Sequence, residues 1–200
     1  MSTPNFETRD PTTAQFWTDR FEQGFTPWDR GGVPAAFQHF VNTASAPLTT
    51  LIPGCGVGYE VAMLGEAGWP VTAIDFSPAA VAAAQNMLGP WADHVTQADF
   101  FQYRPAQPLD LIYERAFLCA LPRAMWPQVA QRWAQLLPAD GLLAGFFLFD
   151  TALRGPPFGA DPAQLHALLL PNFCLVDDQP VTDSIDVFAD KERWQVWRRR

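Results

Sequence analysis

A glycine-rich bend follows an apolar run in the first third of the chain. The bend covers residues 53–58, includes Gly54 and Gly56, and opens a helical pattern. Glycine lets the backbone approach a ligand without a Cβ in the way. In open α/β sheets, ligands bind at the carboxyl ends of the strands near the switch point. Dinucleotide dehydrogenases carry a related loop there, so the bend alone also fits an NAD-linked enzyme.

An acid follows the bend at the distance that ribose recognition requires. Asp75 ends the next apolar run, roughly twenty residues past the loop, where a carboxylate accepts hydrogen bonds from ribose hydroxyls. We expect its neighbour Phe76 on the cofactor side as well. The alternative is a capping acid in front of the helix start formed by Ser77 and Pro78.

A second acid and an aromatic pair follow the third apolar run. Asp99 can accept from an adenine amino group while Phe100 packs on the base; the alternative is a turn acid next to core phenylalanines. Two spaced acids favour S-adenosylmethionine (SAM) over NAD, because SAM has no pyrophosphate that needs an anion cradle. Tyr59 also stands where the third glycine of a dinucleotide fingerprint falls.

These side chains need a sheet that brings strand ends together, and the apolar pattern predicts one. Strands are expected at 48–52, 71–74, 94–98, 109–113 and 142–149, alternating with helices at 59–67, 78–88 and 123–137. Alternating strands and helices indicate right-handed crossovers and a parallel sheet. A helix at 161–170 and strands at 173–176 and 194–197 would close the sheet with an antiparallel hairpin. A helix at 12–23 and another from Pro34 precede it.

Composition narrows the class of protein. The chain has 200 residues, a formal net charge of −8 and a pI of about 4.7, which suits one domain and disfavours a nucleic-acid partner. We expect Arg198, Arg199 and Arg200 to be a solvated end. Residues 1–7 lack the pattern of a signal peptide, and the longest apolar stretch is too short to span a bilayer. Three cysteines without metal spacing indicate reduced thiols, no metal site and a cytoplasmic protein.

Several ordered segments together resemble the thiopurine S-methyltransferase family of SAM-dependent enzymes, and more narrowly its halide and thiol methyltransferase branch. The similarity runs from about Phe16 to the last tryptophans. The segments are Phe16-Trp17 with Arg20-Phe21, Thr26-Pro27-Trp28-Asp29, Pro53-Gly54-Cys55-Gly56, Asp75 with Ser77-Pro78, Asp99-Phe100-Phe101, Tyr113-Glu114-Arg115 with Phe117-Leu118-Cys119-Ala120-Leu121-Pro122, and Gly155-Pro156-Pro157-Phe158. The chain departs from the family at Glu114, where Asp is frequent, and at Arg154, where Gly is frequent.

The resemblance implies a Rossmann-like class I SAM-dependent methyltransferase fold. That fold has a mostly parallel seven-stranded sheet with helices on both faces and an N-terminal helical lid. The whole chain, 1–200, would be one domain in which 1–45 forms the cap. The resemblance also places Trp28, Gly54, Asp75, Asp99 and Phe100 at the SAM site, Arg115 toward the acceptor, and Phe16 and Trp17 in the lid.

The chemistry of two side chains agrees with that placement. Trp28 against the sulfonium would give a cation–π contact of about 0.5–2 kcal/mol, although a tryptophan that only closes the core is an open alternative. Arg115 lies among apolar neighbours, where a cation lowers the pKa of an acceptor thiol or holds an anionic acceptor. Its alternative role is an ion pair with Glu114 or a surface acid.

We therefore expect methyl transfer from SAM to a small soft nucleophile (a thiol, thiopurine, halide or chalcogen anion), leaving S-adenosylhomocysteine. A thiolate needs no dedicated general base, and Cys55 and Cys119 are expected to be small hydrophobes rather than nucleophiles. The alternatives are an NAD-linked oxidoreductase and a SAM-binding protein without catalysis. The expected partner is a small-molecule acceptor, without nucleic acid or membrane, on a monomer or weak dimer.

Overall fold

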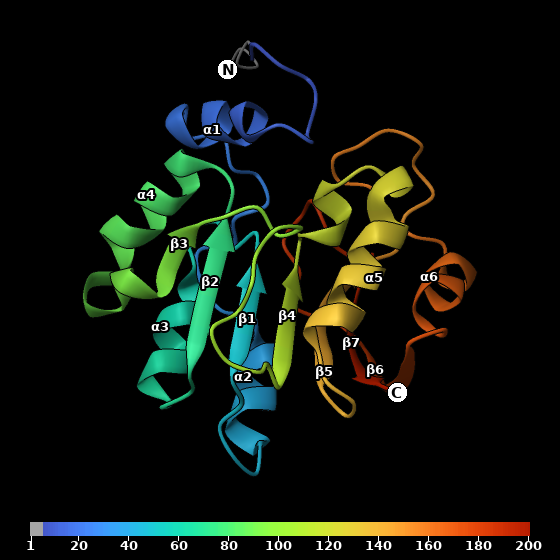
Figure 1. The fold of residues 1–200 in the computed structure, drawn as a ribbon. Coiled ribbons are helices and arrows are strands. Elements are labelled where there is room, and N and C mark those ends of the chain that lie inside the picture. Colours follow the sequence, from blue (N-terminus) through green and yellow to red (C-terminus); the bar gives the residue numbers. More distant parts are fainter. Residues whose placement is uncertain (1–5) are drawn as a thin grey trace.

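Five apolar segments form the parallel part of a seven-stranded sheet in the computed structural model, which describes residues 6–200 (Figure 1). The strands are β1 (Thr50–Pro53), β2 (Val71–Asp75), β3 (Val95–Gln97), β4 (Leu111–Arg115) and β5 (Leu142–Leu148). The hairpin of β6 (Phe173–Pro180) and β7 (Glu192–Arg199) completes the order β3-β2-β1-β4-β5-β7-β6, with β7 antiparallel to both neighbours. The expected α/β class and the closing hairpin are confirmed.

The chain reverses its direction of growth between β1 and β4, which places the switch point at the glycine bend. β1 pairs in parallel with β2 on one side and with β4 on the other. The next pair, β4 and β5, approaches closely because Gly145 has no side chain. A Cβ at Gly145 would lie 1.9 Å from the carbonyl oxygen of Glu114.

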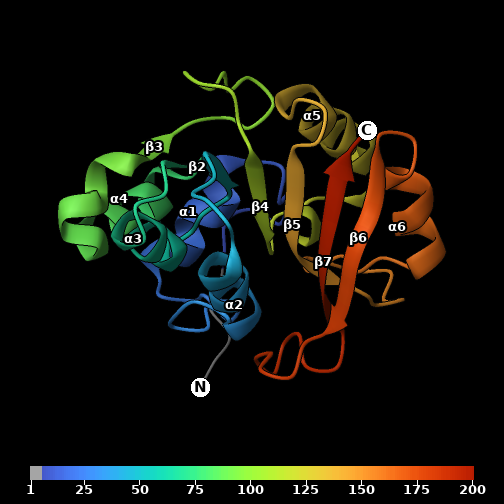
Figure 2. The ribbon, with the colours of Figure 1, turned by 90° about the horizontal axis from the view of Figure 1, so that it is seen from below.

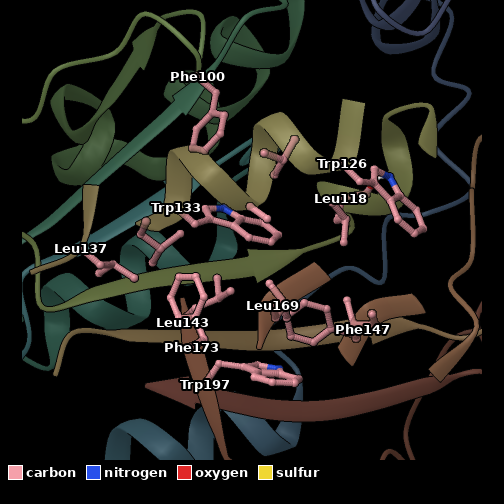
Figure 3. Packing of buried hydrophobic residues seen from close by; sticks show 14 of the residues in the cluster. Phe100, Leu118, Trp126, Trp133, Leu137, Leu143, Phe147, Leu169, Phe173 and Trp197 are labelled. Carbon is pink, nitrogen blue, oxygen red and sulfur yellow. Dashed lines mark hydrogen bonds between the residues drawn. The ribbon is translucent and has the colours of Figure 1, made fainter. Parts of the chain in front are cut away.

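Two layers of helices bury the faces of the sheet (Figure 2). The helices α2 (Ala35–Thr43), α3 (Tyr59–Glu66) and α4 (Pro78–Leu88) pack on one face. The other face carries α5 (Trp126–Leu136) and α6 (Pro162–Leu169). Figure 3 shows this second core, where Trp133 of α5, Phe147 of β5 and Trp197 of β7 pack together.

Local signals fix where the helices begin. The Ser77 hydroxyl accepts from the Ala80 backbone N–H at 3.2 Å and Pro78 starts α4, as the sequence predicts. Asp161 and Gln164 form a reciprocal capping box at α6. At α1 (Ala14–Glu22) the capping residue is Thr13, whose hydroxyl accepts from Phe16 N–H at 3.4 Å.

Some element boundaries differ from those expected. The strand expected at 109–113 begins at Leu111 and ends at Arg115, so Arg115 is the last residue of β4. The helix expected at 123–137 is a 3₁₀ turn, η3 (Arg123–Met125), followed by α5, because Pro127 suits the first turn of an α-helix. The 3₁₀ helix η1 (Gly89–His94) takes the residue expected to open β3, and η2 (Leu118–Ala120) was not expected.

The expectation of a solvated C-terminal end holds for Arg198 and Arg200, which are exposed, and is wrong for the half-buried Arg199. Arg199 donates from Nε to the carbonyl of Ala134 at 3.0 Å, near the end of α5. Arg200 donates from Nε to the carbonyl of Leu170 at 3.1 Å, at the end of α6. Cations stabilise the unpaired carbonyls at helix C-termini. These two arginines therefore tie the closing strand to both helices of that face.

The N-terminal helix lies across the strand ends on which the site is built. Figure 1 shows α1 above the tips of β1 and β2. The buried Thr18 and Ser77 hydroxyl oxygens lie 3.0 Å apart and join α1 to the start of α4. Residues 1–5 of the expected cap and of the stretch 1–7 lie outside the described residues. Within residues 6–200, no helix is long and apolar enough to cross a membrane.

Candidate active site

A cavity of about 790 Å³ opens at the carboxyl ends of the parallel strands, beneath α1. Its walls come from the glycine bend, the tips of β2 and β4, the loop after β3, the cap, and two loops near the C-terminal hairpin. Every residue that the sequence assigned to cofactor or acceptor lines it: Phe16, Trp17, Trp28, Gly54, Gly56, Asp75, Phe76, Asp99, Phe100 and Arg115.

The backbone of the glycine bend lies close to Phe117, in the loop that follows the neighbouring strand β4. Gly54 has φ +61°, and a Cβ there would lie 2.7 Å from the Phe117 ring. The Phe117 ring in turn packs edge-on against Phe100, with centroids 4.9 Å apart. A side chain at Gly54 would therefore clash with the Phe117 ring unless that ring moved.

Asp75 is buried at the tip of β2 and fixed by backbone donors. Its Oδ1 accepts from Ser77 N–H at 2.9 Å and its Oδ2 accepts from Gly56 N–H at 3.2 Å. Burial raises the Asp75 pKa to about 6, against these hydrogen bonds. Each carboxylate oxygen can accept more than one hydrogen bond, so the side chain can still accept from a ligand. The alternative role, a carboxyl that orders the start of α4, is thus present together with cavity exposure.

Asp99, like Asp75, stabilises a turn and also lines the cavity. Its Oδ1 accepts from Phe101 N–H at 2.8 Å, so it is a turn acid, and it also lines the cavity. Phe100 is buried, packs on Phe101 with ring centroids 5.4 Å apart, and belongs to the core as well as to the cavity wall. Neither alternative excludes a ligand.

The cap covers the cavity with aromatic rings. Trp17 packs edge-on against Phe16 at 4.9 Å and against Trp28 at 5.3 Å between centroids. Phe21 packs edge-on against Trp28 at 6.1 Å. The Trp17 indole N–H donates to the Pro11 carbonyl at 2.8 Å, which holds it to the start of the cap. Edge-to-face packing favours this arrangement beyond simple burial.

Arg115 meets a buried acid that the sequence did not indicate. Its Nη1 donates to Glu192 Oε1 at 3.0 Å, and both side chains are largely buried, with 13% and 4% of their surface exposed. The expected alternative partners, Glu114 or a surface acid, are wrong. Glu192 is the first residue of β7 and faces Leu148 of β5, so only the strand pairing brings it to Arg115. Among the described residues, Arg115 Nη2 is buried without a hydrogen-bond partner.

Glu114, the residue before Arg115, is a buried carboxyl that differs from Arg115 in being mostly uncharged. Its Oε1 accepts from the backbone N–H groups of Phe117 and Leu118, at 3.1 and 3.3 Å, and so holds the loop after β4. Burial raises the Glu114 pKa to about 8, so this carboxyl is mostly protonated at neutral pH. The pair of adjacent residues therefore presents a neutral acid to the core and a cation to the cavity.

A second polar group on the cavity wall was missed by the sequence reasoning. Glu60, near the start of α3, is buried and accepts from the Tyr113 hydroxyl at 3.3 Å. Burial raises the Glu60 pKa. Tyr59 donates from its hydroxyl to Asp29 Oδ2 at 3.3 Å, which joins α3 to the cap loop. Tyr113 itself is fully buried.

The cysteines fit the expectation of small hydrophobes. Cys119 is buried, Cys55 is half-buried, and burial raises the pKa of both thiols well above the usual value. Protonated thiols are poor nucleophiles. In the described part of the chain, His, Cys, Asp and Glu side chains form no group of three that could hold a metal ion.

The comparisons with known proteins agree with this site. The sequence profile of the family described as thiopurine S-methyltransferase (TPMT) matches residues 12–200. The chain belongs to this family. Thiocyanate methyltransferase 1 of Arabidopsis thaliana is 31% identical over 92% of this chain and 84% of the plant protein. Thiopurine S-methyltransferase of Shewanella sp. (strain ANA-3) is 28% identical over 90% of each chain.

Solved structures show the same fold at lower identity. The 1,6-didemethyltoxoflavin-N1-methyltransferase of Burkholderia thailandensis, solved with S-adenosylhomocysteine, has a TM-score of 0.76 and 17% identity over 100% of this chain and 93% of its own. The magnesium protoporphyrin IX methyltransferase of Synechocystis PCC 6803, solved with SAM, has a TM-score of 0.71 and 18% identity over 98% and 100%. As a family member with this fold, the protein is a SAM-dependent methyltransferase. Neither an NAD-linked oxidoreductase nor a SAM-binding protein without catalysis is favoured by these matches.

The pKa of Asp75 predicts how SAM affinity depends on pH. If the ribose hydroxyls donate to the charged carboxylate, as the sequence predicts, SAM affinity is constant well above pH 6 and falls below it, approaching about tenfold per pH unit. Asp75→Ala should weaken SAM binding more than about tenfold at pH 7.5, and Asp75→Asn should remove the pH dependence. Calorimetric titration measures both.

The control is Asp110→Ala, because Asp110 caps the Thr49 N–H at 2.8 Å at the opposite end of the sheet. We expect wild-type SAM affinity for that variant. Unchanged affinity in Asp75→Ala would remove Asp75 from the ribose role.

The buried neutral Glu114 predicts a stability change with pH. The pKa of Glu114 in the folded state lies above that of an unfolded glutamate. Its stabilising contribution to the free energy of unfolding is therefore fully present below about pH 4.5 and is lost as pH rises through about 8. Glu114→Gln mimics the protonated acid. The variant should therefore gain stability relative to wild type between pH 5 and 8, by at least about 1 kcal/mol, or roughly 2–4 °C in Tm.

Thermal unfolding across this pH range gives the variant-minus-wild-type difference, in which other titrating groups cancel. Exposed Glu66, at the end of α3, supplies the control Glu66→Gln, for which the difference should stay flat. A Glu114→Gln difference that is also flat would contradict a protonated buried carboxyl.

Proposed function

We propose that this protein methylates a small sulfur nucleophile, a thiol that reacts as its thiolate, with SAM as methyl donor. The single observation that carries the proposal is the position of Arg115, a largely buried cation at the cavity wall among apolar side chains. SAM supplies an electrophilic methyl group on a sulfonium, leaving S-adenosylhomocysteine. The named plant relatives, a thiocyanate methyltransferase and a probable thiol methyltransferase that is 34% identical over 78% of this chain, support the same acceptor class.

The cofactor end is proposed for the glycine bend and the tips of β2 and β3. The bare backbone at Gly54 and Gly56 leaves room for the amino-acid part of SAM. Asp75 would accept from the ribose hydroxyls, with Phe76 beside it. Asp99 would accept from the adenine amino group, while Phe100 packs on the base. Trp28 would lie against the sulfonium.

The acceptor end is proposed for the apolar pocket around Arg115. Cys119, Leu148 and Phe188 form a small buried cluster, with Trp28, Ala116 and Ile185 packed against it. Phe16 and Trp17 would close the cavity from the cap and exclude water. In such surroundings a guanidinium stabilises a thiolate more than a thiol, which lowers the pKa of the acceptor. A soft thiolate held in line with the methyl group needs no further base.

We also propose the simplest setting for this enzyme. It would be a single domain, 1–200, with residues 1–45 as its cap, acting on a small molecule in the cytoplasm as a monomer or weak dimer. The net charge of −8 supports the absence of a nucleic-acid partner, because phosphate binding needs a basic face.

An acceptor panel tests the reaction. Purified protein is incubated with SAM and thiophenol, methanethiol, hydrosulfide, thiocyanate, iodide, a thiopurine, and phenol as the oxygen analogue of thiophenol. S-adenosylhomocysteine formation is the readout. We expect turnover with thiols, and thiophenol should exceed phenol by at least about a hundredfold in kcat/KM because only the thiol ionises readily. Turnover confined to iodide, or equal rates for thiophenol and phenol, would overturn the proposed acceptor class.

Arg115 should be needed for turnover but not for SAM affinity. Arg115→Lys keeps a charge but loses the planar fork, and should lower kcat by at least about tenfold with SAM affinity within about twofold of wild type. Arg115→Ala would leave the buried Glu192 carboxylate without its partner. The uncharged variant for comparison is therefore the double substitution Arg115→Met with Glu192→Gln, which removes both charges together. Equal losses of SAM affinity and turnover in these variants would make Arg115 structural.

A further inference from the structure

Glu192 does more than neutralise a buried cation, because of how its two oxygens are used. Oε1 accepts from Arg115 Nη1 at 3.0 Å, and Oε2 accepts from the Ser184 hydroxyl at 2.7 Å. Ser184 lies in the loop between β6 and β7, so the carboxylate is held from both the strand and the loop. A carboxylate with both oxygens engaged cannot rotate without losing a hydrogen bond.

The guanidinium is restrained on further sides. Its carbon lies 4.7 Å from the centroid of the Phe146 ring and 5.9 Å from that of Phe188. With Nη1 committed to Glu192, the Nη2 group remains buried without a partner among the described residues, on a side chain that lines the cavity. Because Nη2 has no partner, the bond from Nη1 to Glu192 is the side-chain hydrogen bond that fixes the guanidinium among the described residues.

We propose that Glu192, fixed by Ser184, is a positioning residue that holds the Arg115 guanidinium at the cavity wall, where it meets the acceptor. The proposal rests on the proposed function for the identity of the acceptor. The buried pair is electrically neutral as a whole, so the acceptor meets a guanidinium held in place rather than a net positive charge. A compact monoanion such as a thiolate fits beside this guanidinium, where the packed side chains of Cys119, Leu148 and Phe188 are apolar. Arg9, Arg20 and Arg30 also line the cavity.

Two substitutions of Glu192 distinguish the effect of its charge from the effect of its hydrogen bond to Arg115. Glu192→Gln removes the charge but keeps an oxygen that can accept from Arg115. Without the negative charge, the fixed Arg115 lowers the pKa of the bound thiol further, and the acid limb of the kcat–pH profile moves to lower pH. Glu192→Ala removes both the charge and the hydrogen bond that fixes Arg115. Arg115 then moves away from the thiol, and the acid limb moves to higher pH.

The experiment measures kcat and KM for thiophenol and SAM across pH in wild type, Glu192→Gln, Glu192→Ala and Ser184→Ala. We expect opposite shifts of the acid limb for Gln and Ala. We also expect a kcat at least about tenfold lower for Ala, an intermediate loss for Ser184→Ala, and SAM affinity within about twofold throughout. Shifts in the same direction, or no shift in either variant, would overturn the positioning role.

Other titratable groups that feel this pair are identified and held constant between variants: Glu60, Tyr113, Glu114 and Cys119. Because the Glu114 pKa is about 8, the series is repeated with Glu114→Gln in every protein, and the same opposite shifts are expected. Their disappearance in that background would assign the effect to Glu114 and overturn the proposal.

The matched control is Asp178→Ala, which breaks the more exposed pair of Arg193 and Asp178 on the same hairpin and should leave kcat unchanged. A readout independent of turnover is the NMR spectrum of the Arg115 guanidinium in the complex with S-adenosylhomocysteine. Separate Nη signals, which indicate slow rotation, are expected in wild type and Glu192→Gln and averaged signals in Glu192→Ala. Averaged signals in wild type would overturn the positioning, whereas a wild type that methylates no thiol would overturn the proposed function alone.

Discussion

The lack of a side chain at Gly54 is the constraint on which the cavity depends. The backbone there lies so close to the Phe117 ring that a Cβ would approach it to 2.7 Å. Phe117 packs on Phe100, and the same bend sends the Gly56 N–H to Asp75 at 3.2 Å. One short segment thus ties together the ends of β1, β2 and β4 and the loop after β3. Because these contacts are mutual, the positions of the acids and of Arg115 are set together rather than one by one.

Among the carboxyl groups buried near these strand ends, those of Asp75, Glu114 and Glu192 are each accommodated differently. Asp75 accepts from backbone donors and keeps a pKa of about 6. Glu114 also accepts from backbone donors, but its deeper burial raises its pKa to about 8 and leaves it neutral at neutral pH. Glu192 pairs with Arg115. Burying a charge is expensive unless it is paired or hydrogen-bonded, and each of these three groups meets that condition by a different route.

Local patterns in the sequence predicted the elements well, because their causes are local. The helix start at Ser77, the glycine bend and the apolar runs of β1, β2 and β5 depend on neighbouring residues and on burial. The closing hairpin was predicted too, although its strands are longer than expected. The site residues taken from the glycine bend and strand ends all line one cavity, since parallel strands bring their carboxyl ends to one edge.

The partners across the sheet could not be predicted from the sequence alone. Glu192 lies 77 positions after Arg115, and only the pairing of β7 with β5 brings the two together. The link of Tyr113 to Glu60 and the contacts of Arg199 and Arg200 with helix ends have the same origin. The sequence does hold a signal for Glu192, an acid that alternates along its strand with the apolar Trp194 and Val196. That pattern says that the acid needs a buried partner, but it does not name the partner.

The neutral pair and the apolar cluster together favour soft nucleophiles over hard ones. A strongly hydrated nucleophile would lose its water on entering the apolar cluster beside Arg115, and a guanidinium already paired with Glu192 would replace little of it. A thiolate is larger and more polarisable, so it loses less on desolvation and gains contacts with Phe188 and Trp28. The same cluster would bind a neutral thiol, and Arg115 would then favour its ionised form. Selection in this site therefore depends more on the cost of removing water than on attraction by charge.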